Sequence, residues 1–148
     1  MAPKAVTASR ILLGLIFVVF GLNGFLHFLP QPPISGPPAA FAGALFASGY
    51  FFPLLKGTEV AAGLLLLSGR YVPLALTVLA PVIVNILAFH TFMDPSGLPI
   101  ALVVAALSLF LLWSYREHFA GLVKPVSRKQ QQTALPNPGA VAQTAVSR

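Results

Sequence analysis

The stretch Phe51–Ser68, FFPLLKGTEVAAGLLLLS, constrains the fold more than any other part of the chain. It is long and apolar enough to cross a bilayer, because about 20 helical residues span about 30 Å of hydrocarbon. Yet it carries Lys56 and Glu59, and an ionisable side chain at that depth faces a bundle interior and finds a partner, or serves a function. Three residues apart, the two side chains share one helical face. The sequence therefore predicts that other helices supply companions for Glu59.

Composition indicates an integral membrane protein. Hydrophobic residues make up 57% of the 148 residues and charged residues only 8%, whereas a soluble domain carries about a quarter charged residues. So little charge could not cover a water-exposed surface. The net charge of +6 comes from residues at the predicted helix ends, which indicates membrane topology and anionic lipid headgroups rather than nucleic acid. The sequence has no cysteine, which excludes disulfides, thiolate metal ligands and thiol-exchange catalysis.

Four apolar runs predict an all-α fold, an integral membrane bundle of four transmembrane helices. The runs cover about residues 9–29, 51–68, 71–92 and 98–116. The proline-rich segment after the first run cannot continue a helix, and the small apolar residues 39–48 predict a short interfacial helix between the first two spans. A signal peptide is the alternative for the first run. This run is too long and has no nearby cleavage site, so we expect a retained helix.

Basic residues predict the orientation of this bundle, which covers residues 1–123. Lysine or arginine lies before the first helix, in the turn after the second and beyond the fourth, but not in the loops after the first and third. The positive-inside rule therefore predicts both termini in the cytoplasm and a bacterial inner (cytoplasmic) membrane as the location. Residues 124–148 begin with Lys124, Arg128 and Lys129 and continue with Gln, Pro, Ala, Thr and Ser. We expect this part to be a disordered basic cytoplasmic tail.

Polar residues of three predicted helices fall at matching depths below the outer interface. At about 1.5 Å per residue, one layer lies about 3–8 Å deep and a second layer about 9–12 Å deep. The first layer contains His27, Lys56 and His90, and the second contains Asn23, Glu59 and Asn85. The inner halves of the helices are almost purely apolar. Polar residues that only hold helices together by hydrogen bonds would occur in both leaflets, whereas these lie in the outer leaflet alone. We therefore expect the six residues to line an outer-leaflet pocket, with residues 39–48 covering it as a roof.

These six residues could have any of several roles. Asn, His and Lys–Glu pairs also serve as hydrogen-bonded glue between membrane helices. An amphipathic ligand such as a quinone suits the pocket, with His27 or His90 donating to an oxygen and Glu59 exchanging protons. A metal site would use His27, His90 and either Glu59 or Asp94, but no HxxxH or HxxE spacing occurs. A haem would need the two histidines as its ligands, and ion transport would place polar residues nearer the midplane.

Three segments resemble the DoxX family of small bacterial membrane proteins. They are RILLGLIFVVFGLNGFLHFLP (Arg10–Pro30), FFPLLKGTEVAAGLLLLSGRYVPLAL (Phe51–Leu76) and PVIVNILAFHTFMDPSGLP (Pro81–Pro99). The shared features are a GLxFxxxGxxxF-like first helix, a KxxE pair opening the second, and NxxxxH closing the third. The resemblance spans nearly all of Ser9–Val123 and implies a four-helix bundle. The family takes its name from a subunit associated with a thiosulfate:quinone oxidoreductase, so the resemblance implies a role in membrane redox chemistry.

Together these features predict a component or accessory of a membrane redox system that is linked to quinone. Its partners would be the lipid bilayer, quinone, and a membrane or exported redox protein. A non-catalytic membrane accessory or small-ligand-binding protein is the alternative, and a transporter fits four helices less well unless the chain forms oligomers. No catalytic residue is indicated, because the sequence has no phosphate loop, nucleotide fingerprint or soluble nucleophile motif.

Overall fold

A computed structural model of the chain describes residues 3–30 and 33–120. The chain divides into two compact units, Met1–Arg116 and Glu117–Arg148. All long helices belong to the first unit, and the described part of the second contains the rest of the short helix α6 (Arg116–Phe119). The predicted tail, 124–148, lies outside the described residues. Within the described ranges every regular element is helical, which confirms the prediction of an all-α fold.

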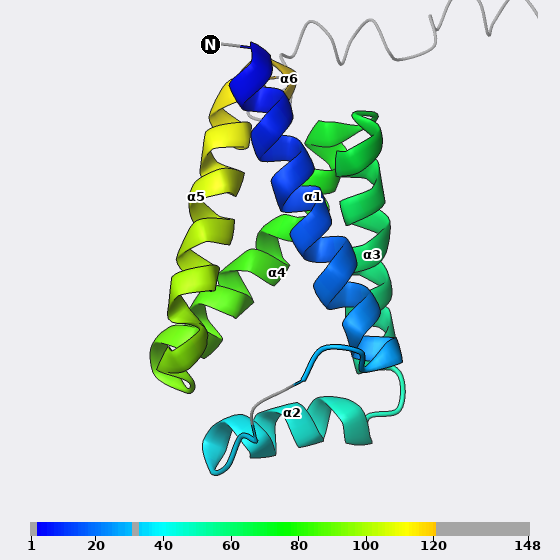
Figure 1. The fold of residues 1–148 in the computed structure, drawn as a ribbon, viewed down its shortest axis with the longest axis vertical. Coiled ribbons are helices and arrows are strands. Elements are labelled where there is room, and N and C mark those ends of the chain that lie inside the picture. The colour runs from blue at the N-terminus through cyan, green and yellow to red at the C-terminus, as the bar shows by residue number, and fades with distance from the viewer. Residues whose placement is uncertain (1–2, 31–32, 121–148) are drawn as a thin grey trace, which may run out of the picture. The chain divides into compact units, whose positions relative to one another are not determined.

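The four long helices of the first unit run alternately up and down (Figure 1). The helices of this unit are α1 (Pro3–Leu26), α2 (Pro37–Ala47), α3 (Phe51–Ser68), α4 (Val72–Phe92) and α5 (Leu98–Ser114), with a 3₁₀ turn, η1 (Pro95–Gly97), before α5. Among the described helices, α1, α3, α4 and the continuous η1–α5 segment are long and apolar enough to cross a membrane. The prediction of four such helices is therefore confirmed. The shorter α2 lies across the end of the bundle where α1 ends and α3 begins.

Glycines bring α1 and α3 into close antiparallel contact. A Cβ atom added at Gly14 would lie 3.0 Å from the carbonyl oxygen of Gly63, and one added at Gly63 would lie 3.0 Å from that of Gly14. Seven residues further along α1, a Cβ at Gly21 would lie 2.7 Å from Val60 Cγ2 on α3. Close van der Waals packing of this kind drives helix association in a bilayer, where lipid tails are as apolar as the helices.

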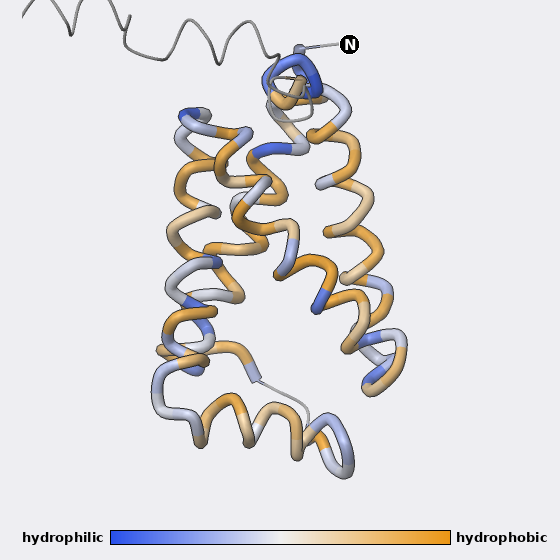
Figure 2. Tube along the Cα trace, turned by 180° about the vertical axis from the view of Figure 1, so that it is seen from behind, coloured by the Kyte–Doolittle hydropathy of each residue, from blue (hydrophilic) through white to orange (hydrophobic). Residues whose placement is uncertain are grey.

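The bundle is apolar both inside and outside. Its largest fully buried side chains come from all four long helices: Leu13, Leu66, Leu76, Leu79, Leu111 and Val72. Large apolar side chains also cover the outside, such as Leu64 on α3 and Leu109 on α5, which are more than half exposed. Figure 2 shows hydrophobic residues along most of the length of these helices. A helix that is hydrophobic all round suits a large protein core or a lipid environment, and no protein core surrounds these outer faces in the described chain.

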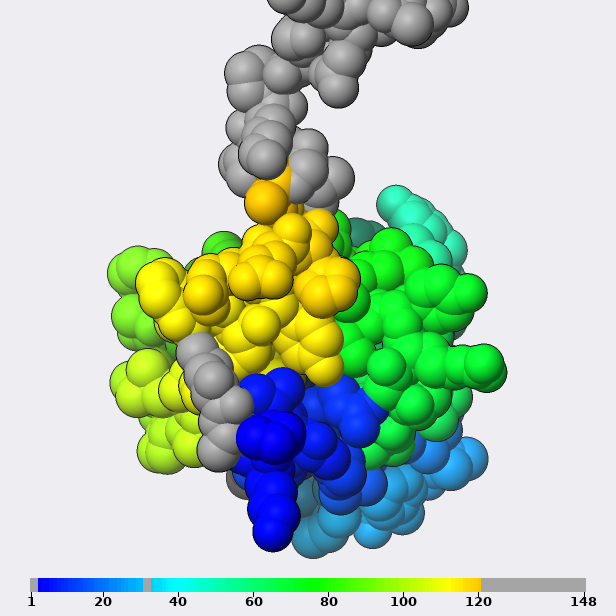
Figure 3. Space-filling model, turned by 90° about the horizontal axis from the view of Figure 1, so that it is seen from above, coloured from blue at the N-terminus to red at the C-terminus, as the bar shows by residue number. Residues whose placement is uncertain are grey.

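Apart from Lys56 near the start of α3, the described lysines and arginines of the first unit gather at one end. Lys4 and Arg10 lie near the start of α1, Arg70 follows α3, and Arg116 follows α5. The start of α1, the α3–α4 turn and the end of α5 lie side by side at this end (Figure 3). Arg10 also joins two helices, because its Nη1 donates a 2.9 Å hydrogen bond to the carbonyl oxygen of Leu66. The same carbonyl oxygen accepts a hydrogen bond from the backbone N–H of Gly69 at 3.2 Å, so the guanidinium adds a second donor and places a cation near the negative end of α3.

The end of α1 differs from the expected boundary at residue 29, for a local reason. The side-chain oxygen of Asn23 accepts a 2.7 Å hydrogen bond from the backbone N–H of Leu29, and this bond turns the chain away from the helix axis. His27 takes the left-handed backbone conformation, with φ of 50°, which is the usual conformation just after a helix end. The helix therefore stops at Leu26, although the apolar residues continue beyond it.

Candidate ligand-binding site

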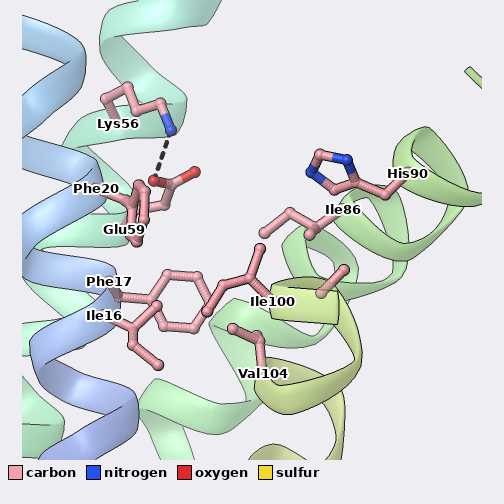
Figure 4. Close-up of a pocket in the computed structure, with 10 residues that line it drawn as sticks. Ile16, Phe17, Phe20, Lys56, Glu59, Ile86, His90, Ile100 and Val104 are labelled. Carbon is pink, nitrogen blue, oxygen red and sulfur yellow. Dashed lines mark hydrogen bonds and ion pairs between the residues drawn. The ribbon is translucent and has the colours of Figure 1, made fainter. Parts of the chain in front are cut away.

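A cavity of about 190 Å³ lies between the four long helices, toward the end where α3 begins and α4 ends. Most of its wall is apolar, and its polar groups come from α3 and α4 (Figure 4). The lining residues are Ile16, Phe17 and Phe20 on α1, Lys56 and Glu59 on α3, Ile86 and His90 on α4, and Ile100, Ala101 and Val104 on α5. An apolar pocket with a few convergent polar groups is the usual form of a small-molecule site.

The polar side of the cavity on α3 is a close ion pair. Lys56 Nζ donates a 2.8 Å hydrogen bond to Glu59 Oε2, and Glu59 is only 3% exposed. Gly24 on α1 makes room for the lysine, because a Cβ there would lie 2.7 Å from Lys56 Cγ. Among the residues that the structure describes, none donates a hydrogen bond to the second carboxylate oxygen, Oε1. Glu59 therefore keeps a free acceptor beside the cavity.

His90 brings a second acceptor from the opposite side of the cavity. Its Nδ1 lies 2.9 Å from the backbone oxygen of Asp94, and since a carbonyl oxygen can only accept, Nδ1 carries the proton in this bond. The edge of the ring that bears Nε2 points toward the cavity and Glu59 (Figure 4). In the neutral imidazole, Nε2 is thus an acceptor. The ring also rests on Gly97, where a Cβ atom would overlap it.

The loop after α4 holds this imidazole in place. Asp94 Oδ1 accepts hydrogen bonds from the hydroxyl of Ser96 at 2.6 Å and from its backbone N–H at 3.3 Å. The second carboxylate oxygen of Asp94 lies 3.7 Å from His90 Nδ1. A histidine whose Nδ1 is bound to a carbonyl and whose neighbouring carboxylate is itself held has a defined ring orientation and tautomer. Asp94 therefore positions His90 without lining the cavity.

The other three candidates of the sequence constellation lie outside the cavity lining. Asn23 is buried, but its side-chain oxygen serves the end of α1 through Leu29. His27 follows that helix end and is exposed. Asn85 is exposed on α4. The structure thus brings together Lys56, Glu59 and His90.

The cavity also differs from the expected pocket in its walls. α5 contributes three apolar lining residues, whereas the expected pocket had walls from only the first three long helices. No described residue of α2 lines the cavity, although residues 39–48 were expected to form a roof. Instead, Phe46 of α2 stacks on Phe52 of α3 with ring centroids 3.8 Å apart, and Phe41 packs against Phe89 of α4 at 5.8 Å. Depth matching of polar residues could not detect the wall from α5, because that wall is apolar.

The metal hypothesis required His27, His90 and a carboxylate to converge. His90 and Asp94 are neighbours, but within residues 3–30 and 33–120 no three His, Cys, Asp or Glu side chains form a group that could hold a metal ion. The three-residue set that the metal hypothesis required is therefore not assembled among the described side chains.

None of the protein-family models, curated proteins or solved structures compared with the chain matches it significantly. The features of the chain that bear on function are therefore the shape and chemistry of the cavity itself. Those features are one apolar chamber, one buried ion pair and one oriented imidazole.

Proposed function

We propose that the chain spans a bacterial inner membrane four times, with both termini in the cytoplasm. Four helices of sufficient length and hydropathy support this arrangement. The basic residues at the end that holds the start of α1 and the end of α5 support the orientation, because lysine and arginine favour the cytoplasmic side. In this orientation α2 lies at the outer interface, and the cavity opens in the outer half of the membrane.

We infer that the cavity binds the headgroup of a quinone. An engineered cavity of about 150 Å³ in another protein binds benzene. A cavity of about 190 Å³ therefore holds one substituted quinone ring but not the long isoprenoid tail attached to that ring. Phe20 on α1 and Ile100 on α5 line the cavity and are 44% and 41% exposed. They form a rim on the outer surface of the bundle, where an isoprenoid tail could leave the cavity and lie in the lipid.

The observation that carries this proposal is the pair of free acceptors facing the cavity, Glu59 Oε1 and neutral His90 Nε2. A reduced quinone carries two hydroxyl donors, and its oxidation releases two electrons and two protons. Glu59 and His90 can accept hydrogen bonds from these hydroxyls and take up the protons. Lys56 can then donate to the resulting carbonyl oxygen. The electrons pass to a membrane or exported redox protein, in keeping with the role that the resemblance to DoxX proteins implies.

The two histidines provide a matched test of this site. We expect purified protein in lipid nanodiscs to bind a short-chain quinol, and to bind the quinol more tightly than the quinone. His90→Ala should weaken binding about two- to tenfold, the value of one hydrogen bond. His27→Ala should leave binding unchanged, because His27 is exposed and lies outside the cavity lining. Equal effects of the two substitutions, or no binding by the parent protein, would overturn the proposal.

The rate of quinol oxidation distinguishes a redox component from a non-catalytic accessory protein. In membranes that contain the native partners, loss of Glu59 as a proton acceptor in Glu59→Gln should slow quinol oxidation more than it weakens binding. Quinol binding with no contribution to oxidation in these membranes would instead favour the non-catalytic accessory function.

A further inference from the structure

Asn85 is a polar residue on the outside of the bundle, deep within α4. It follows Ile83, which is buried, by two residues, so its side chain points about 200° around the helix from the core direction. It also lies seven residues before the end of α4 at Phe92, which corresponds to about 10 Å along the axis. In the membrane-spanning arrangement proposed above, on which this inference rests, its amide group faces hydrocarbon.

The amide of Asn85 has no partner among the described residues. Other exposed polar side chains in the long helices behave differently. The hydroxyl of Thr77 on α4 donates to the carbonyl oxygen of Pro73 at 2.9 Å, and that of Thr58 on α3 donates to Leu54 at 2.8 Å. Asn85 has two N–H donors and one oxygen acceptor, and lipid tails can satisfy none of them. A protein partner in the membrane is needed to do so.

The surroundings of Asn85 form a continuous outer face of α4. Leu74, Val78, Pro81, Asn85 and Phe92 are all exposed, and they are spaced by 4, 3, 4 and 7 residues. With the last interval counted as two turns, the average step is about 3.6 residues, so these five side chains lie along one face of the helix, where a second helix crossing at a shallow angle can contact them. A single Asn in such a line fixes the register and the number of associated helices in coiled coils.

We propose that this face, here called the α4 outer face, binds the α4 outer face of a second copy of the chain. Two copies with the same orientation in one membrane are related by a two-fold axis along the membrane normal, so both Asn85 residues lie at the same depth. A primary amide is both donor and acceptor, and each Asn85 can therefore donate to the other. This self-complementarity at equal depth favours a second copy over an unrelated partner, which would need its own polar group at that depth.

Cysteine cross-linking of the full-length chain in membranes tests the dimer, since the natural sequence has no cysteine. Val78 lies seven residues before Asn85 on the same face, and we expect Val78→Cys to form a disulfide-linked dimer on oxidation. Leu109→Cys, on an exposed face of α5, serves as the control and should remain monomeric. Adding Asn85→Leu to Val78→Cys removes both reciprocal hydrogen bonds and should lower the dimerisation constant by about 10-fold or more, since each interhelical hydrogen bond contributes about 0.6–2 kcal/mol.

The same variants separate the dimer from the membrane topology. If Val78→Cys and Leu109→Cys both resist a water-soluble maleimide, the helices are in the membrane. Equal cross-linking of the two variants, or cross-linking that Asn85→Leu does not weaken, would then refute the dimer alone. Cross-linking of Val78→Cys to a different protein would also refute the second copy as partner. Rapid maleimide labelling of both cysteines in intact membranes would instead refute the spanning arrangement.

Discussion

The close contact between α1 and α3 makes the bundle sensitive to a single methyl group at Gly63. A Cβ there would lie 2.8 Å from Val18 Cγ2 and 3.0 Å from both Val18 N and the oxygen of Gly14. Two of these three atoms belong to the backbone of α1, so Gly63→Ala must push the whole helix away. Overpacking of this kind costs about 1–3 kcal/mol, against a gain of up to about 1 kcal/mol from the better helix propensity of alanine.

Gly57, six residues earlier on α3, is the matched control. No atom lies within 4 Å of a Cβ placed there, so Gly57→Ala receives the same propensity gain without the steric cost. The free energies of unfolding of the two variants should therefore differ by about 1–3 kcal/mol, with Gly63→Ala the less stable. Denaturant titration in mild detergent, followed by circular dichroism, measures this difference. Equal stability of the two variants would refute the glycine-mediated contact.

Three further predictions concern the helix end and the oriented imidazole. His27→Gly should preserve or raise the free energy of unfolding, by up to about 1 kcal/mol, because glycine adopts the left-handed conformation of this position without strain; a marked loss of stability would contradict this role. Asn23→Ala should lower the free energy of unfolding by about 1–3 kcal/mol, since it leaves the N–H of Leu29 without its acceptor, and hydrogen exchange at that amide should accelerate. Gly97→Ala should displace the His90 ring and weaken quinol binding in titrations with little change in unfolding; unchanged affinity would show that the ring position does not matter.

The helix positions could be predicted well where glycine or proline marks their ends. α3 occupies Phe51–Ser68, as the sequence indicated, and it is bounded by Gly49 and Gly69, both with positive φ. Residues with that conformation stop a helix, and glycine adopts it without cost. α1 lacks such a signal. Its end depends on the side chain of Asn23, and hydropathy does not report which hydrogen bonds that side chain makes.

The sequence could predict how deep in the membrane each site residue lies, but not in which direction its side chain points around the helix axis. A rise of about 1.5 Å per residue places Lys56, Glu59 and His90 in neighbouring layers, and the structure brings these three to one cavity. Asn85 and His90 are five residues apart, which separates them by about 140° around one helix. They could not both face the cavity, and which one does depends on the packing of α4. Likewise, His27 would share a face with Asn23 only if α1 continued, and it ends one residue earlier.

The most direct measurement of the central claim is photolabelling of the full-length protein in membranes with a quinol that carries a photoreactive group on its ring. We expect labelling of the cavity wall at Phe20 on α1 and Ile100 on α5, competition by unlabelled quinol, and weaker labelling of both positions in His90→Ala at the same quinol concentration. Label on the outer face of α4 or near His27, or label that unlabelled quinol does not displace, would contradict the account.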